Sequence, residues 1–324
     1  MPMNPSIAII LPAFNEELTI AGTIKDFFGA CPEAEIYVID NASTDRTNEI
    51  ARQTYQELRC KGRLMFEGRK GKAAAVRKAF FEVNADIYVM ADSDMTYPAA
   101  DLGKLLAPVL EGRADIVCGN RHDSGVYKRE NKRPFHDFGN NLVRGLINRL
   151  FKGNLEDILT GYRVMTKRFV KNYPILAGGF EIETEMSIHA LDKGYTILEL
   201  PTDYRDRPEG SFSKLNTFTD GMLVLKTIFS IFVKYRPLLF FSICGVAFAI
   251  AGLTAGSLPV IEYFQTGKVS RFPLAILASG LSILSMISFA VAVILDSLAA
   301  AQRFNHALSL LHWQDLSREK LPNA

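Results

Sequence analysis

Two carboxylates, Asp92 and Asp94, stand one residue apart directly after the apolar run 87–90. Such a run is typical of a buried strand, and ligands of open α/β sheets bind beyond the carboxyl ends of the strands. The two acids, with the hydroxyls of Ser93 and Thr96, suit a hard divalent cation that also binds a substrate's phosphates. The alternative is an Asp-rich turn that starts the next helix, because Asp and Ser favour helix N-termini. The pair alone leaves both interpretations open.

Cations follow other turns of the chain. Lys72 opens an alanine-rich helical stretch after Gly71, where its charge and the free backbone N–H groups could meet an anion. The basic segment 121–152 has apolar residues at helical spacing, which is typical of a helix on an anionic membrane surface or of a core-packed helix. The loop 204–214 combines cations with hydroxyls and is typical of phosphate binding.

Apolar runs and helical patterns alternate through the first 120 residues. Strands are expected at 6–11, 35–39, 87–90 and 114–118, with helices at 17–28, after 72 and at 101–110, and an edge strand at 195–200. This alternation predicts the α/β class with a mostly parallel sheet covered by helices on both faces. Asp40 would end the second strand, which makes it a better ligand candidate than the helix-start residues that follow.

Two stretches near the end of the chain carry no charged residue, 237–261 and 272–295. Each exceeds the roughly 20 apolar residues that span a bilayer as a helix. They predict two transmembrane helices at about 238–258 and 272–295, the alternative being buried core helices. Basic residues flank the pair, and the positive-inside rule then places both termini in the cytoplasm.

The membrane part is predicted to anchor rather than transport, because its spans hold no ionisable residue. Gly245, Ala249, Gly252 and Gly256 recur at helical spacing and permit close helix packing, which predicts a homo-oligomer. The N-terminal residues do not form a signal peptide pattern, so the large domain is expected in the cytoplasm. The cysteines show no metal-binding spacing, and a net charge of +2 gives no reason to expect a nucleic acid partner.

Motifs at 12–17, 40–47, 71–72, 92–94, 119–121, 157–163 and 213–215 resemble, in order, those of family 2 glycosyltransferases of the polyprenyl-phosphate type, which are similar to dolichol-phosphate-mannose synthase. The resemblance covers about residues 6–220, and the two spans match the bacterial form. It implies a GT-A domain at 1–215, interfacial amphipathic helices at 216–236, two spans within 237–296 and a cytoplasmic tail at 297–324. A processive polysaccharide synthase is disfavoured, because its Gln-x-x-Arg-Trp signature is missing.

The resemblance also implies the chemistry. A sugar would move with inversion from a nucleotide diphosphate sugar to a polyprenyl phosphate, with Mg²⁺ or Mn²⁺, at the cytoplasmic face of the inner membrane. A separate flippase would move the product. A UDP-hexose or UDP-N-acetylhexosamine is favoured over GDP-mannose, and a non-catalytic nucleotide-binding scaffold is the alternative of another class.

The implied residues form four groups. The nucleotide sugar would contact Pro12, Phe14, Glu16, Asp40, Lys72 and Asp92; the metal would bind Asp92 and Asp94; the catalytic acids would be Asp94, Asp157 and Glu183; and the acceptor phosphate would meet Arg121, Arg205, Arg207, Ser213 and Lys214. Thr96-Tyr97-Pro98 replaces the Gln or Ser usual in mannosyl and glucosyl members, which leaves the third metal ligand and the sugar open.

Overall fold

The computed structural model describes residues 5–121, 134–175, 182–208, 229–230, 233 and 235–319, without the side chains of 134–140 and 312–319. The chain divides into two compact units, Met1–Val224 with Ser309–Ala324, and Leu225–Leu308. We call them the sheet unit and the hairpin unit.

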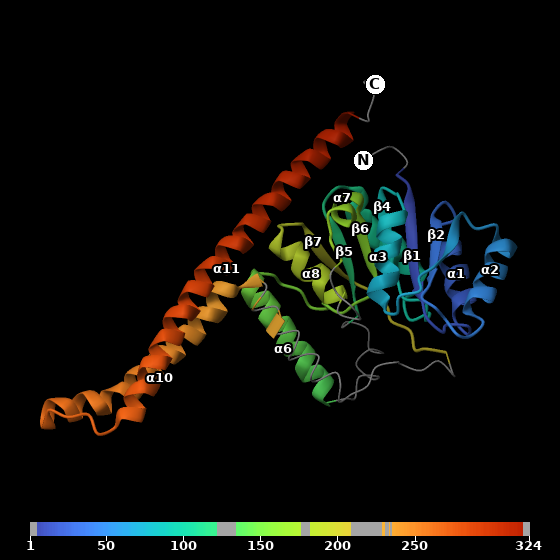
Figure 1. The fold of residues 1–324 in the computed structure, drawn as a ribbon. Coiled ribbons are helices and arrows are strands. Elements are labelled where there is room, and N and C mark those ends of the chain that lie inside the picture. Colours follow the sequence, from blue (N-terminus) through green and yellow to red (C-terminus); the bar gives the residue numbers. More distant parts are fainter. Residues whose placement is uncertain are drawn as a thin grey trace. The chain divides into compact units, whose positions relative to one another are not determined.

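The described part of the sheet unit contains a seven-stranded sheet in the order β3-β2-β1-β4-β6-β5-β7 (Figure 1). The strands are β1 (Ile7–Ala13), β2 (Glu35–Asp40), β3 (Gly62–Phe66), β4 (Ile87–Met90), β5 (Ile116–Asn120), β6 (Arg163–Thr166) and β7 (Ile197–Pro201). All pairings are parallel except those of β6, which runs antiparallel to β4 and β5. The predicted α/β class, the mostly parallel sheet and the edge strand are confirmed.

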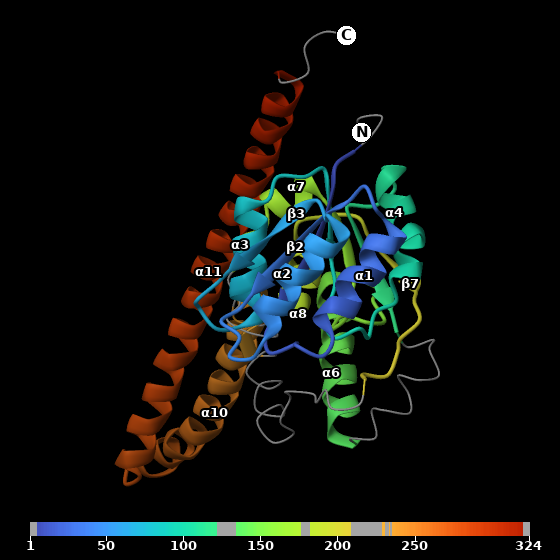
Figure 2. The ribbon, with the colours of Figure 1, turned by 90° about the vertical axis from the view of Figure 1, so that its right-hand side faces the viewer.

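Helices cover both faces of the sheet. They are α1 (Ile20–Ala30), α2 (Thr47–Leu58), α3 (Lys72–Glu82), α4 (Leu102–Leu110), α6 (Pro134–Phe151), α7 (Lys167–Lys171) and α8 (Ile182–Asp192), with a 3₁₀ turn at Ala99–Asp101. Successive residues of a strand point to opposite faces. Ala8 and Ile10 accordingly pack in one core cluster with α3, α7 and α8, whereas Ile9 and Leu11 pack in the other with α1 and α4. Figure 2 views the sheet from the side of α1 and α2.

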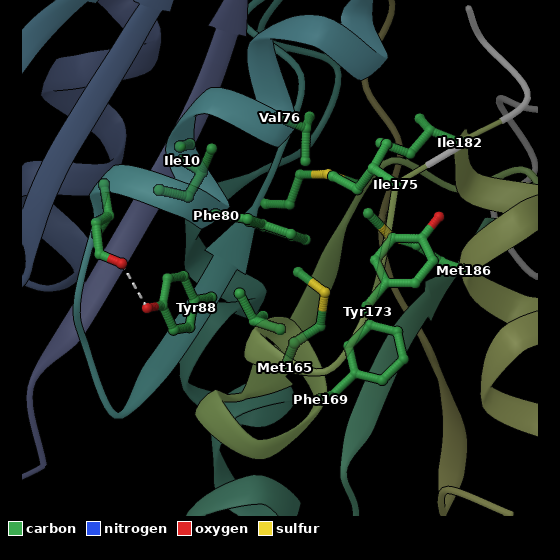
Figure 3. Packing of buried hydrophobic residues seen from close by; sticks show 14 of the residues in the cluster. Ile10, Val76, Phe80, Tyr88, Met165, Phe169, Tyr173, Ile175, Ile182 and Met186 are labelled. Carbon is green, nitrogen blue, oxygen red and sulfur yellow. Dashed lines mark hydrogen bonds between the residues drawn. The ribbon is translucent and has the colours of Figure 1, made fainter. Parts of the chain in front are cut away.

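The core on the α3 side is aromatic and closely packed (Figure 3). The rings of Phe80 and Tyr88 meet edge to face, and the Tyr88 hydroxyl donates to the Val83 carbonyl at 2.8 Å. Phe169 stacks on Tyr173. Together the two core clusters bury both faces of the central strands.

Two strands were not expected from the sequence. β3 has one buried residue among five, and β6 is four residues long and runs directly into α7 without a polar turn. Neither has the alternation or the flanking turn by which a strand is recognised.

The described part of α6 has one buried row and one exposed edge. Val143, Ile147 and Phe151 are buried in the sheet unit, whereas Leu142 and Arg149 are exposed. The core-packed interpretation therefore holds for the buried row. Contact of the exposed edge with a membrane surface stays a prediction.

The hairpin unit consists of α10 (Pro237–Thr266) and most of α11 (Phe272–Glu319). Both helices are long and apolar enough to cross a membrane. Gly245, Gly252 and Gly256 face α11, where an added Cβ would come within 3.4 Å of its atoms, and the Ser285 hydroxyl donates to the Gly245 carbonyl at 2.8 Å. These small residues thus pack the two helices of one chain together, and the homo-oligomer stays a prediction.

Candidate active site

The loops that follow β1 and β2 are joined by hydrogen bonds. The backbone N–H of Asn15 donates to the Ser43 hydroxyl at 3.0 Å, and that of Glu16 donates to the Thr47 hydroxyl at 2.7 Å. In return the Asn15 side-chain oxygen accepts from the Thr44 N–H at 2.8 Å. Because side chains of each loop form hydrogen bonds with backbone groups of the other, the two loops hold each other in place without a ligand.

The residues predicted to hold the nucleoside lie on these two strand ends. Pro12, Phe14 and Glu16 are half-buried, and Asp40 is 3% exposed. One Asp40 oxygen accepts from the Ser43 N–H and the other from the Asn48 amide, each at 3.0 Å. The strand order makes β1 and β2 neighbours, so the structure brings these four residues to one edge of the sheet.

A neighbouring loop is fixed by Asn41, whose role the sequence did not indicate beyond a helix start. Its buried amide donates to the carbonyls of Glu67 (3.1 Å) and Arg69 (2.6 Å), and its oxygen accepts from the Gly71 N–H at 2.7 Å. Gly71 has a φ of 112°, which side chains with a Cβ rarely adopt. Asn41 and Gly71 together set the point at which α3 begins with Lys72.

Lys72 lies between two carboxylates. Its ammonium contacts Asp92 and Glu183, the latter at 2.5 Å, and the Glu183 side chain is 5% exposed. Burial lowers the pKa of Lys72, but the attraction of Asp92 and Glu183 outweighs it and raises the pKa above its usual value. These carboxylates, from the end of β4 and the start of α8, balance a cation at a helix N-terminus.

Asp157 is held by Arg121 in a two-point ion pair. The Arg121 Nε lies 2.7 Å and Nη2 lies 2.9 Å from the two carboxylate oxygens, and both residues are buried. Glu199 of β7 holds the backbone at Asp157, because its oxygens accept hydrogen bonds from the N–H groups of Glu156 (2.6 Å) and Asp157 (2.8 Å). Burial raises the pKa of Glu199. No sequence pattern indicated this supporting role.

Asp94 pairs with Arg207 at 2.6 Å, and its other oxygen accepts from the Thr96 hydroxyl at 2.6 Å. Arg205, which was predicted beside Arg207, pairs instead with Asp26 of α1 at 2.8 Å. The structure therefore brings one of these two arginines to the Asp-x-Asp turn and not the other. Ser213 and Lys214 lie outside the described residues.

Tyr97 and Tyr204 connect the ion pairs. Their rings meet at a centroid distance of 5.8 Å, and the Arg121 guanidinium lies 5.6 Å from the centre of the Tyr204 ring. Burial raises the pKa of Tyr204 to about 12, with Arg121 opposing that rise and Asp94 adding to it. Tyr97 accepts the Gly161 N–H at 2.8 Å, and a Cβ on Gly161 would come within 2.7 Å of the Asp92 carboxylate. A side chain at position 161 would therefore displace the Asp92 carboxylate.

The donor set suits a cation that is shared with a ligand. Within the part of the chain that the structure describes, no three His, Cys, Asp or Glu side chains gather to hold a metal. Asp94, however, directs a carboxylate oxygen at a guanidinium cation, which shows that a positive charge fits at that point. A divalent ion at Asp92 and Asp94 would complete its shell with phosphate oxygens and water, as Mg²⁺ commonly does.

The fold is of the GT-A type, with a mostly parallel sheet. The structure of glucosyl-3-phosphoglycerate synthase from Mycobacterium tuberculosis, determined with Mn²⁺, UDP and phosphoglyceric acid, superposes with a TM-score of 0.55. The two sequences are 22% identical, and the match covers 71% of this chain and 78% of the M. tuberculosis chain.

Residues 8–173 match the family described as Glycosyl transferase family 2. Glycosyltransferase AglJ of Haloferax volcanii is 32% identical over 78% of this chain and 80% of its own length. The dolichyl-phosphate hexose transferase of the same organism is 27% identical over 71% of this chain and 95% of its length. The chain belongs to glycosyl transferase family 2 and is a glycosyltransferase with two apolar helices that fit membrane association.

Proposed function

We propose that the protein transfers a sugar from a UDP-hexose or UDP-N-acetylhexosamine to a polyprenyl phosphate, with inversion, at the cytoplasmic face of the membrane. The observation that carries this proposal is the set of ion pairs around Tyr97 and Tyr204, in a chain that also has two apolar helices. Cations that are paired with acids can turn to phosphates when these arrive. The apolar helices fit an acceptor that resides in the bilayer.

The donor half of the proposal rests on the strand ends of β1, β2 and β4. Pro12, Phe14, Glu16 and Asp40 would hold the nucleoside, and Lys72 would approach the diphosphate. A divalent ion on Asp92 and Asp94 would neutralise charge on the departing diphosphate. The M. tuberculosis enzyme was crystallised with Mn²⁺ and UDP, which supports a UDP-sugar and a divalent ion here.

The acceptor half rests on Arg121 and Arg207 from the described residues, together with Ser213 and Lys214 from the sequence; Arg205 is left out because its side chain pairs with Asp26. The name of the H. volcanii dolichyl-phosphate hexose transferase supports a lipid phosphate acceptor. Both termini would then lie in the cytoplasm, the protein would form a homo-oligomer, and a separate flippase would move the glycolipid.

The reaction needs no strong base. The second pKa of a phosphate monoester is about 6, so the lipid phosphate is largely a dianion at neutral pH. One of its oxygens forms the bond to the anomeric carbon while the bond from that carbon to the diphosphate oxygen breaks, and UDP leaves with the electron pair. Asp157 has both oxygens on Arg121, which favours a role in orienting the acceptor arginine over taking up a proton.

The test is a transfer assay with purified full-length protein in polyprenyl phosphate micelles. Radiolabelled UDP-glucose, UDP-N-acetylglucosamine, UDP-galactose and GDP-mannose are offered in turn, with Mg²⁺ or Mn²⁺, and the label in the organic extract is counted. We expect label from a UDP-sugar that depends on both the lipid and the metal. Label from GDP-mannose alone would overturn the nucleotide assignment. Nucleotide binding with no transfer from any donor would favour the non-catalytic scaffold.

A further inference from the structure

The Asp94 carboxylate is covered on both oxygens. Oδ1 accepts from the Thr96 hydroxyl at 2.6 Å and from the Thr96 N–H at 3.2 Å. Oδ2 accepts from Arg207 Nη2 at 2.6 Å, and the Asp94 side chain is only 5% exposed. Thr96 is a near neighbour in the turn, so Oδ1 is held locally. The guanidinium on Oδ2 comes from a segment far along the chain.

That segment is fastened just before Arg207. The Thr202 N–H donates to the Asn120 carbonyl and the Arg205 N–H donates to the Thr96 carbonyl, each at 2.9 Å. The Arg205 side chain is drawn outward to Asp26. Arg207, two residues farther on, has a side chain that is 29% exposed and directed back to Asp94. The backbone is therefore anchored next to the turn, while the arginine side chain keeps a route to solvent.

From this geometry we infer that Arg207 and the divalent metal compete for Asp94 Oδ2, so that only one of them is bound to it at a time. The inference rests on the function proposed above. Asp94 Oδ2 already accepts from the Arg207 guanidinium at 2.6 Å, so a divalent ion that bound the same oxygen, at the roughly 2.0–2.1 Å usual for Mg²⁺, would lie next to that positive charge. Two cations on one oxygen of a nearly buried carboxylate would repel each other strongly. Arg207 is thus the counter-ion of Asp94 in this structure.

The exchange has a consequence for the acceptor. Binding of a metal with the nucleotide would release the Arg207 guanidinium from Asp94, while the Arg205 backbone, two residues earlier, is hydrogen-bonded to the Thr96 carbonyl. A freed guanidinium in this place has five N–H donors to offer to a phosphate. The enzyme would therefore present its acceptor cation after the donor has bound, and unproductive binding of the lipid phosphate would be limited until then.

The two possible roles of Arg207 predict opposite effects of its removal on the affinity for metal. If Arg207 only helped to hold phosphates, its removal would weaken or leave unchanged the binding of metal and nucleotide. If it competes for Oδ2, its removal tightens the binding of the metal alone. We expect Arg207→Ala and Arg207→Gln to bind Mn²⁺ about tenfold more tightly than the wild type, in line with the loss of one charge-assisted hydrogen bond to a partly exposed partner.

The experiment is a titration of full-length protein in detergent with MnCl₂, in which free Mn²⁺ is followed by its electron paramagnetic resonance signal, first without nucleotide and then with UDP. Arg205→Ala is the matched control, because its side chain pairs with Asp26, and its Mn²⁺ affinity should equal that of the wild type. Equal Mn²⁺ affinity in the wild type and both Arg207 variants would overturn the exchange while leaving the metal site in place. Equal affinity in the wild type and Asp94→Asn would instead remove the metal assignment on which the inference rests.

Discussion

The two halves of the candidate site satisfy their polar groups in different ways. At the ends of β1 and β2, side chains such as Ser43 and Asp40 bond to backbone N–H groups of their own or the neighbouring loop. At the ends of β4, β5 and β7, acids bond to cations instead: Asp92 and Glu183 to Lys72, Asp157 to Arg121, and Asp94 to Arg207.

The difference indicates a division of labour. Bonds from side chains to backbone fix a shape, which suits recognition of a nucleoside. Ion pairs between side chains hold charge that a phosphate or metal can take over, although breaking such a pair on one side leaves the partner buried and uncompensated. We call these the shape half and the charge half. The predictions below separate them.

The largest effect is expected from Asp94→Asn. Loss of the carboxylate charge should lower transfer at least about 10³-fold, because the charge half loses its cation site. The circular dichroism spectrum and the melting temperature should change little. Asp86→Asn is the control at the opposite end of β4, where the acid bonds to Ser6, and it should keep full activity. Full activity of Asp94→Asn, or of the wild type in excess chelator, would contradict the metal assignment.

A smaller loss is expected from Arg121→Lys, which keeps the charge and loses the two-point contact with Asp157. We expect the KM for polyprenyl phosphate to rise about 10- to 100-fold, and the affinity for UDP to stay within about twofold. Arg168→Lys is the matched control, since Arg168 also lies over a tyrosine ring and pairs with an aspartate. If UDP affinity falls while the lipid KM is unchanged, Arg121 serves the donor.

A substitution in the shape half should raise the KM for the UDP-sugar and leave the KM for the lipid unchanged. Asp40→Asn retains the size of the side chain but can no longer accept from both the Ser43 N–H and the Asn48 amide. We expect the KM for the UDP-sugar to rise about tenfold with the lipid KM unchanged, which corresponds to the loss of about one hydrogen bond. Glu35→Gln at the other end of β2 provides the comparison. A change confined to the lipid KM would end the proposed division.

The smallest effect concerns the contribution of Lys72 to stability, which should not depend on pH near neutrality. The pKa of Lys72 is raised in the folded protein, so its stabilising charge is fully present below the unfolded pKa of about 10.4 and is lost only as pH rises through the folded pKa. The difference in melting temperature between the wild type and Lys72→Met should therefore be constant from pH 6 to pH 9. A difference that shrinks across this range would show that Lys72 loses its proton within it.

The sequence predicted the shape of the site better than its pairings. Asp92 and Asp94 were placed at a strand end because the run before them is short and wholly apolar. The partners of these acids come from distant elements, and spacing along the chain carries no information about which cation reaches which acid. Arg205 and Arg207 illustrate this, because they lie outside any regular element and no periodicity tells which of them faces Asp94.

Supporting residues were missed for a related reason. Asn41 has the type of an ordinary helix start, and Glu199 lies in a half-exposed edge strand, so neither stands out by residue type. Their roles arise where β2 meets the loop before α3 and where β7 meets the loop before β6. The antiparallel strand β6 creates the second meeting point, and it was not expected from four buried residues without a turn.

The most direct test of the proposed reaction is to identify both products of a single reaction mixture. The full-length protein is incubated with polyprenyl phosphate and the UDP-sugar that it uses in the transfer assay. The mass of the lipid product is measured by mass spectrometry, and the nucleotide product is identified by ion-exchange chromatography. Attack by the lipid phosphate on the anomeric carbon predicts a lipid with one phosphate and one added sugar, in an amount equal to that of the released UDP. A lipid diphosphate-sugar formed together with UMP would show attack on phosphorus instead and would contradict the account.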